Sequence, residues 1–188
     1  EPEPLADTDS ALSQPEIAPP REILDPLISD IILRNDQEVL TGGGVDVIYF
    51  NQTDEAREEQ KYGSDPLATH GCGPTAMAMA VSSLTGETVD PADMAALCVK
   101  QGYWCRNHGS YLSIVQGVAE SYGLRCEPAD LTDKETLYAR LTSGEMGVAL
   151  MTKGHFTRGG HFILLRGTTL SGEILVADPA SQDRSLIP

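Results

Sequence analysis

The run Gly71-Cys72-Gly73-Pro74, followed by the small and apolar residues 75–81, constrains the chain most strongly. It predicts a helix, because proline suits the first helical position and Gly86 supplies a stop. A cysteine at a helix entry meets unpaired N–H groups and the positive end of the helix dipole, which favour a thiolate. The flanking glycines leave the sulfur uncovered. The run therefore indicates either an activated nucleophile or a buried structural cysteine. The residues that lie near Cys72 distinguish these two interpretations.

The length of 188 residues suits one domain with a tail. The net charge is −15, and residues 1–60 hold fifteen acidic and three basic side chains, or −12, which leaves −3 for residues 61–188. Lys and Arg do not cluster, so nucleic acid is not an expected partner. No apolar run approaches the roughly 18 residues of a membrane span. We expect a monomer without a transmembrane segment.

The front of the chain predicts three parts. Residues 1–24 are acidic and rich in proline, which is typical of a linker that cannot offset its ordering entropy. Apolar residues at helical spacing predict a short amphipathic helix over residues 25–34, and Gly42-Gly43-Gly44 then forms a linker. The main domain is expected at residues 45–188, beginning with a strand over 45–50.

The rest of the chain changes from helices to strands. Residues 53–70 are polar and loop-like, and the Cys72 helix comes next. Caps and stops predict three further helices, at residues 90–102, 110–123 and 132–144, the last opened by a capping box from Thr132 to Glu135. Three short strands are predicted at residues 148–151, 161–166 and 174–178. Helices followed by strands indicate an α+β fold with an antiparallel sheet.

Four cysteines are too few for a disulfide scaffold and lack the paired spacing of a zinc site. Cys98 falls inside a predicted helix and indicates core packing. Cys105 and Cys126 form either a disulfide or two reduced thiols, and spacing leaves both open.

A histidine and a carboxylate stand at the ends of the last two predicted strands. If residues 168–171 form a four-residue loop, paired residue numbers sum to 339 and His161 lies opposite Asp178. The carboxylate can then hold one imidazole nitrogen and leave the other facing a thiol. A turn centred on Ser171-Gly172 would separate the two residues. The plain alternative is an edge histidine beside a strand-terminating Asp-Pro.

Four short runs carry a family resemblance. They are residues 49–52 (YFNQ), 71–76 (GCGPTA), 160–165 (GHFILL) and 176–179 (VADP). Over about residues 45–180 the chain resembles free-standing relatives of the bacteriocin-processing, double-glycine peptidases, a branch of the papain-like cysteine peptidases. The resemblance implies a papain-like fold, with a helical half carrying the cysteine and an antiparallel sheet carrying the histidine and aspartate.

The resemblance also implies roles for four residues. Cys72 would be the nucleophile, His161 the general base and acid, Asp178 the residue that orients the imidazole, and Gln52 a donor to the oxyanion hole. Gln52 precedes Cys72 by 72 − 52 = 20 positions, whereas better-known papain-like enzymes have only a few. Gln60 is therefore a rival donor.

We therefore expect a cysteine peptidase, or a related thiol hydrolase, that cleaves peptide or amide bonds without a cofactor or metal. Its substrate would be a peptide or a peptidoglycan-like amide. The acidic stalk, where transporter-fused relatives carry membrane spans, suggests a place outside the cell or at its envelope. The rival is a papain-like binding module without turnover.

Two further alternatives concern the histidines. A metal site built from Cys72, His70 and His161 is weaker, because nucleophile exposure already explains the glycines and the helix entry. His70, His108 and His155 are other possible bases, but none has a placed carboxylate partner.

Overall fold

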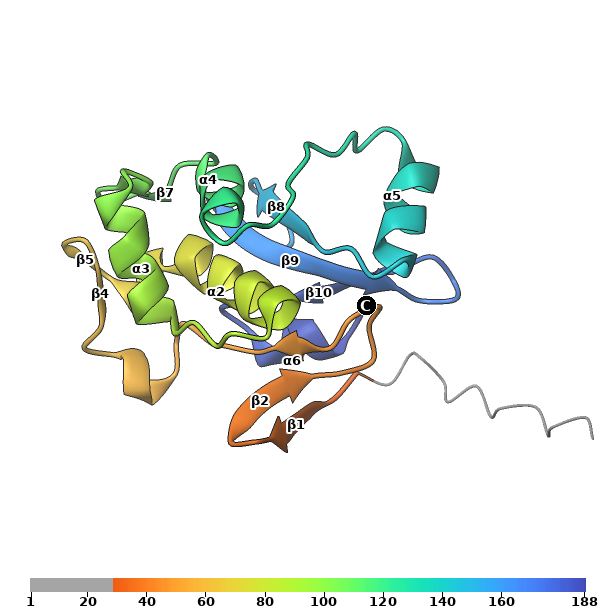
Figure 1. Cartoon of the computed structure of the whole chain (residues 1–188), viewed down its shortest axis with the longest axis horizontal. Coiled ribbons are helices and arrows are strands. Elements are labelled where there is room, and N and C mark those ends of the chain that lie inside the picture. The colour runs from red at the N-terminus through yellow and green to blue at the C-terminus, as the bar shows by residue number, and fades with distance from the viewer. Residues whose placement is uncertain (1–28) are drawn as a thin grey trace, which may run out of the picture.

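The computed structural model describes residues 29–188 and shows a mixed helix and sheet architecture (Figure 1). Helices occupy the middle of the chain and an antiparallel sheet occupies its end, which confirms the α+β fold class. The predicted linker at residues 1–24 lies outside the described residues. Within residues 29–188, no helix is both long and apolar enough to cross a bilayer.

Helix α2 (Cys72–Thr85) forms the centre of the molecule. Its residues from Gly73 to Ser82 are buried, and it packs against three further helices and three strands. It ends at Gly86, whose φ of 75° lies in the left-handed region that favours glycine. Gly71 is the N-cap, so Pro74 is the third helical residue and not the first as predicted. Proline is tolerated there because N–H groups in the first turn have no intrahelical partner.

Helices α3 (Pro91–Lys100) and α4 (Ile114–Ser121) pack against α2, and α5 (Lys134–Thr142) packs against β9. The predicted cap of α3 is confirmed, because Asp90 Oδ1 accepts from Ala92 N at 2.8 Å. Helix α4 begins later than predicted, because Ser110 belongs to strand β7 (Gly109–Ser110), which pairs with β6 (Trp104–Cys105).

The capping box predicted at Thr132 does not form. Asp133 caps α5 and accepts from Thr136 N at 3.0 Å, while the Thr132 hydroxyl donates to Asp130 at 2.7 Å. An aspartate one residue closer to the helix takes the role, because its carboxylate is a good acceptor for the N–H groups of the first turn.

The C-terminal sheet has the strand order β10-β9-β8 and is antiparallel throughout. Its strands are β8 (Gly147–Met151), β9 (His161–Thr168) and β10 (Ile174–Ala177), close to the three predicted strands. Helix α2 packs on β9, and the short helix α6 (Gln182–Leu186) packs on β10. The shared core includes Leu40, Met77, Met79, Met94, Ile114, Phe162 and Leu164.

The predicted register of the β9–β10 hairpin is wrong. Gly167 pairs with Leu175 and not with Gly172, so paired numbers sum to 342 near the loop. A bulge between Leu175 and Val176 then shifts the sum to 341. The loop is a three-residue turn closed by Thr169 N donating to Glu173 O at 2.8 Å, with Gly172 at a φ of 85°. A glycine in the left-handed region at the third loop position is typical of such turns.

The helix predicted over residues 25–34 is wrong for residues 31–34, and its first residues lie outside the described part. Strand β1 (Ile31–Arg34) forms a hairpin with β2 (Gln37–Leu40), and β3 (Val47–Ile48) completes the sheet. Asn35 and Asp36 form a two-residue turn with φ values of 51° and 60°. Asn and Asp tolerate this conformation, and β-branched isoleucines suit a strand. The sheet crosses the boundary predicted at residue 45.

The polar segment 53–70 is ordered. It contains the short helix η1 (Glu55–Arg57), strands β4 (Lys61–Tyr62) and β5 (Asp65–Pro66), and helix α1 (Leu67–His70). Arg57 anchors it through two 3.1 Å hydrogen bonds to the carboxylate of Asp90 and lies over the ring of Phe50. The segment therefore delivers the chain to Cys72 in a defined position.

Arg166 on β9 is fully buried and ties distant segments together. Its guanidinium donates to Val176 O at 2.9 Å, Thr41 O at 3.1 Å and Ser185 O at 3.0 Å. Burial lowers the pKa of Arg166 to about 10. The arginine therefore joins β10 and α6 to the N-terminal sheet.

Candidate active site

Cys72 is the first residue of α2 and is partly exposed. The first N–H groups of a helix have no intrahelical partner, so they surround the thiol with hydrogen-bond donors. Gly73 lets the helix approach Ser110, because a Cβ at position 73 would lie 2.3 Å from Ser110 Oγ. The start of α2 thus lies close to Ser110, and Cys72 stays partly exposed.

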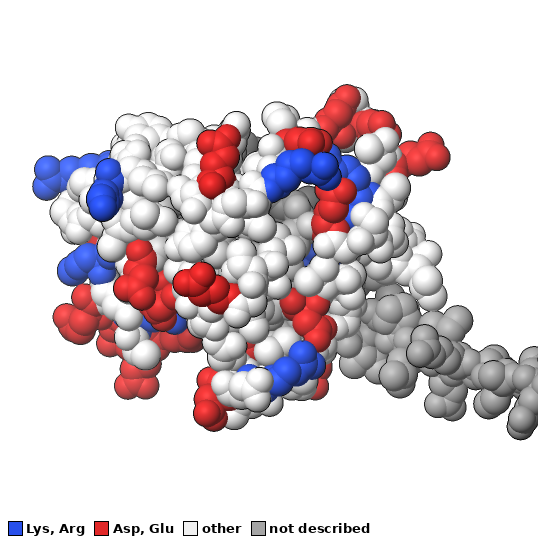
Figure 2. Space-filling view, viewed as in Figure 1, with Lys and Arg blue, Asp and Glu red and all other residues white. Residues whose placement is uncertain are grey.

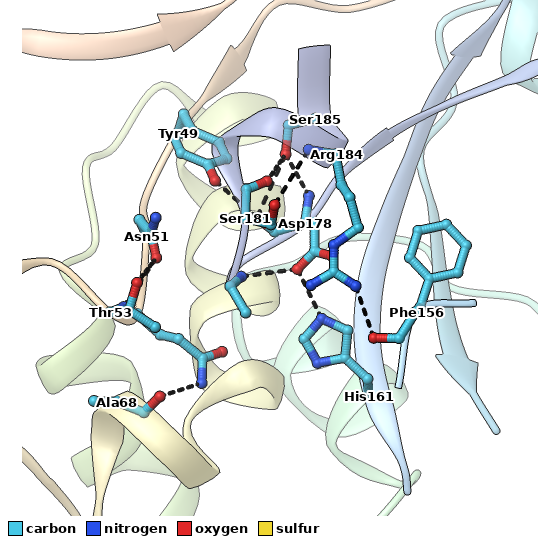
Figure 3. Close-up of polar contacts among 12 residues, drawn as sticks. Tyr49, Asn51, Thr53, Ala68, Phe156, His161, Asp178, Ser181, Arg184 and Ser185 are labelled. Carbon is cyan, nitrogen blue, oxygen red and sulfur yellow. Dashed lines mark hydrogen bonds and ion pairs between the residues drawn. The ribbon is translucent and has the colours of Figure 1, made fainter. Parts of the chain in front are cut away.

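His161 and Asp178 form a buried pair, with Nε2 of the imidazole 2.7 Å from Oδ1 of the carboxylate (Figure 3). His161 begins β9, and Asp178 directly follows β10. The predicted contact is present although its register was wrong. If the observed register continued, Ile163 would face Asp178, and His161 is the diagonal neighbour on the same face of the sheet. Diagonal neighbours lie within reach of long side chains.

The backbone and the carboxylate of Asp178 are both held by neighbouring residues (Figure 3). Its backbone N–H donates to Ser185 Oγ at 2.8 Å, and its carbonyl accepts from the Tyr49 hydroxyl at 2.8 Å. Oδ1 also accepts from Ala180 N at 2.8 Å. Arg184 Nε lies 3.0 Å from Oδ2, but its N–H is not aimed at this oxygen, so the contact is an ion pair and not a hydrogen bond. Burial raises the pKa of Tyr49, which stays a neutral donor.

The environment of His161 favours its charged form. Burial lowers the pKa of His161, but hydrogen bonds with Asp178 and Cys72, together with the charges of both groups, outweigh it and raise the pKa to about 9. Nε2 binds Asp178, and Nδ1 does not. Cys72 also contributes to the raised pKa of His161, so the imidazole lies near both groups.

Gln52 is buried and lies between the two halves of the site. Its Nε2 donates to Ala68 O on α1 at 2.8 Å, and its backbone N–H donates to Pro179 O at 2.7 Å. The first contact leaves one N–H of the amide uncommitted. Gln60, the rival, accepts from Arg57 Nη1 at 3.1 Å within the ordered insert. Gln52 therefore contacts both the helix that precedes Cys72 and the residue that follows Asp178.

One family model, described as the Peptidase_C39 like family, matches residues 45–186, which is more than half of the chain. The chain belongs to the Peptidase_C39 like family. This confirms the resemblance found in the sequence, implies a papain-like fold and suggests cysteine peptidase activity in general. Neither a curated protein nor a solved structure matches the chain.

The other histidines of this Peptidase_C39-like chain have different surroundings. His70 contacts the Thr69 hydroxyl through Nδ1 at 2.8 Å, and His108 lies exposed in the turn between β6 and β7. The ring of His155 meets the edge of Phe156 with centroids 5.3 Å apart. Across residues 29–188, no group of three or more His, Cys, Asp or Glu side chains is placed to hold a metal ion.

All four cysteines are free, so Cys105 and Cys126 are not joined. Cys105 lies near Tyr111, and Cys126 lies near Glu120. Cys98 is fully buried in the core, as predicted, and burial raises its pKa to about 12.

Three residues of the Asp178 environment were missed from the sequence. Tyr49 was noted in a motif without a role, while Ser185 and Arg184 were not considered. The available signal was Ser181, which caps α6 by accepting from Arg184 N at 3.2 Å. A helix directly after Asp178 would have pointed to nearby side chains on its first turn.

Proposed function

We propose that the chain is a cysteine peptidase, or a related thiol hydrolase, that cleaves peptide or amide bonds. Cys72 serves as nucleophile, His161 as general base and acid, Asp178 as the residue that orients the imidazole, and Gln52 as an oxyanion donor. The observation that carries the proposal is the buried imidazole of His161, which binds Asp178 through Nε2 and lies close enough to Cys72 for both groups to raise its pKa. Membership of the family supports the same class of activity.

The reaction follows from these groups. The Cys72 thiolate attacks the amide carbonyl and forms a C–S bond, while the backbone N–H of Cys72 and the uncommitted N–H of Gln52 stabilise the oxyanion. His161 then protonates the leaving amine as the C–N bond breaks. Water attacks the thioester, His161 accepts its proton, and the acid product leaves as the thiol is restored. No step requires a cofactor.

The proposed substrate is a peptide or a peptidoglycan-like amide outside the cell or at its envelope. The acidic, proline-rich front of the chain motivates this location. On the face shown in Figure 2, Lys and Arg side chains lie apart among acidic ones and form no continuous patch. This distribution does not favour nucleic acid, which requires clustered cations.

Labelling with iodoacetamide at a series of pH values tests the proposal. Cys72, Cys105 and Cys126 are all partly exposed, so they serve as matched thiols, and buried Cys98 is the unreactive control. We expect Cys72 to react selectively well below the free-thiol pKa of about 8.5, and H161A to remove this selectivity. Equal labelling of the three exposed thiols would contradict the proposal. Selective labelling without hydrolysis of any amide would indicate a binding module.

A further inference from the structure

We propose that Arg184 is a positioning residue with two effects. Its charge weakens the attraction between Asp178 and the proton of His161, and its contact with Phe156 fixes the loop that leads into β9. The inference rests on the proposed function of the same site. The evidence is that the guanidinium of Arg184 contacts both Asp178, which binds His161, and Phe156, in the loop directly before His161.

The position of Arg184 is set by α6. Ser181 caps this helix by accepting a hydrogen bond from the backbone N–H of Arg184. The side chain of Arg184 then extends alongside Asp178 (Figure 3). Nε lies 3.0 Å from Asp178 Oδ2, and Nη1 donates to Phe156 O at 2.7 Å. The guanidinium carbon also lies 5.9 Å from the centre of the Phe156 ring. Arg184 thus bridges the carboxylate and the loop.

The loop at residues 152–160 joins β8 to β9 and ends directly before His161. It is partly self-contained, since Gly154 N donates to Thr157 O at 2.9 Å and Gly159 N to Thr157 Oγ1 at 3.0 Å. The bond from Arg184 to Phe156 O connects this loop to α6. The start of β9, and therefore the imidazole, is fixed relative to Asp178.

The charge of Arg184 acts on the same carboxylate. Asp178 is fully buried and gives Oδ1 to His161 and Ala180, while Oδ2 faces Arg184. The imidazolium and the guanidinium therefore share one negative charge. The other ionisable neighbours are Cys72 on α2, which favours the imidazolium, and Tyr49, which is neutral. Without Arg184, Asp178 would hold the His161 proton more strongly, and the pKa of His161 would rise.

Four variants separate charge from structure. R184M removes the charge and both contacts, R184Q removes the charge but keeps a donor for Phe156 O, and R184K keeps the charge. R158Q is the matched control, because Arg158 is an exposed cation in the same loop. Thermal melts report whether each variant folds, and R184Q replaces R184M if R184M does not.

The measurement is the titration of the His161 ring by NMR over about pH 6 to 11, with its signal assigned from H161Q. We expect R184M and R184Q to raise the pKa of His161 by about half a unit or more, and R184K and R158Q to leave it within about 0.2 unit. An unchanged pKa in the charge-removing variants, or an equal rise in R158Q, would overturn the inference.

The titration needs no turnover, so it separates this inference from the proposed function. A shift in R184M and R184Q in a protein that hydrolyses no amide would leave the inference standing and reject the peptidase. Hydrolysis of an amide by these variants, together with an unchanged pKa of His161, would reject this inference and leave the peptidase proposal standing.

Discussion

The two halves of the site are held in different ways. Cys72 begins a helix whose signals are local, from Gly71 to Gly86, and whose next ten residues are buried against apolar neighbours. His161 depends on Asp178, which is fixed by hydrogen bonds from segments far apart in the sequence, from Tyr49 to Ser185. Cys72 is therefore positioned by packing, and His161 by a polar network.

This difference predicts different responses to change. A side chain removed beneath α2 leaves a cavity, which lowers the free energy of unfolding. A single hydrogen bond in the network contributes only about 1 kcal/mol net to stability, but it decides the orientation of the imidazole. Changes in the helix should damage folding first, and changes in the network should damage chemistry first.

The largest expected effect concerns the two reacting groups. C72A and H161A should each lower kcat/KM by at least about 10³-fold, and the double variant should be no worse, because members of such a unit fail together. The measurement is kcat/KM on any cleaved amide, with thermal melts as the folding control. Near-normal turnover in H161A would mean that another histidine, such as His70, serves Cys72.

The next effect tests the bridge between the halves. Q52A should lower kcat by about 10² to 10³-fold, the usual loss for one oxyanion donor. Q60A is the control and should leave kcat near its original value, because Gln60 binds Arg57 within the insert. A larger loss of kcat in Q60A than in Q52A would show that Gln60, and not Gln52, is the oxyanion donor.

A core substitution tests the packed half. M79A should lower the free energy of unfolding by about 2 kcal/mol or more, because Met79 is fully buried. L84A on the same helix is the matched control, since Leu84 is exposed, and should change stability by at most about 0.5 kcal/mol. Both are measured by urea denaturation, with Cys72 alkylation followed in parallel. Equal free energies of unfolding for M79A and L84A would contradict the conclusion that packing around α2 positions Cys72.

The smallest effect is a pH dependence from the polar half. The pKa of His161 in the folded state is about 9, above its unfolded value of about 6.5, so the folded state binds this proton more tightly. The resulting stabilisation is complete below about pH 6.5 and is lost as the pH rises through about 9. The stability difference between the original chain and H161Q should therefore shrink across this window. A constant difference would contradict the raised pKa.

Local signals in the sequence predicted the packed half well. The glycines and the apolar run gave α2 and its end, and Asp90 gave the start of α3. The strand ends at His161 and Asp178 gave the contact between them, because the predicted sum of 339 and the sum of 341 observed after the bulge differ by two, which keeps both side chains on one face.

The remaining features depended on contacts that periodicity does not contain. Isoleucines near residue 31 fit a helical stripe, but the Asn35-Asp36 turn and pairing with β2 made a strand. The bulge after Leu175 and the bond from Arg166 to Val176 O are not visible as spacing in the sequence. Arg184 reaches Asp178 only because α6 folds back onto β10.

The bulge between Leu175 and Val176 separates the tip of the hairpin from the chemistry. On the far side of it, the bond from Arg166 to Val176 O fixes the strand independently of the turn. Residues inserted or deleted at Leu170–Gly172 would be absorbed before the bulge, whereas one residue gained between Val176 and Ser185 would displace Asp178. Length variation among related chains should accordingly be tolerated at the first place and excluded from the second.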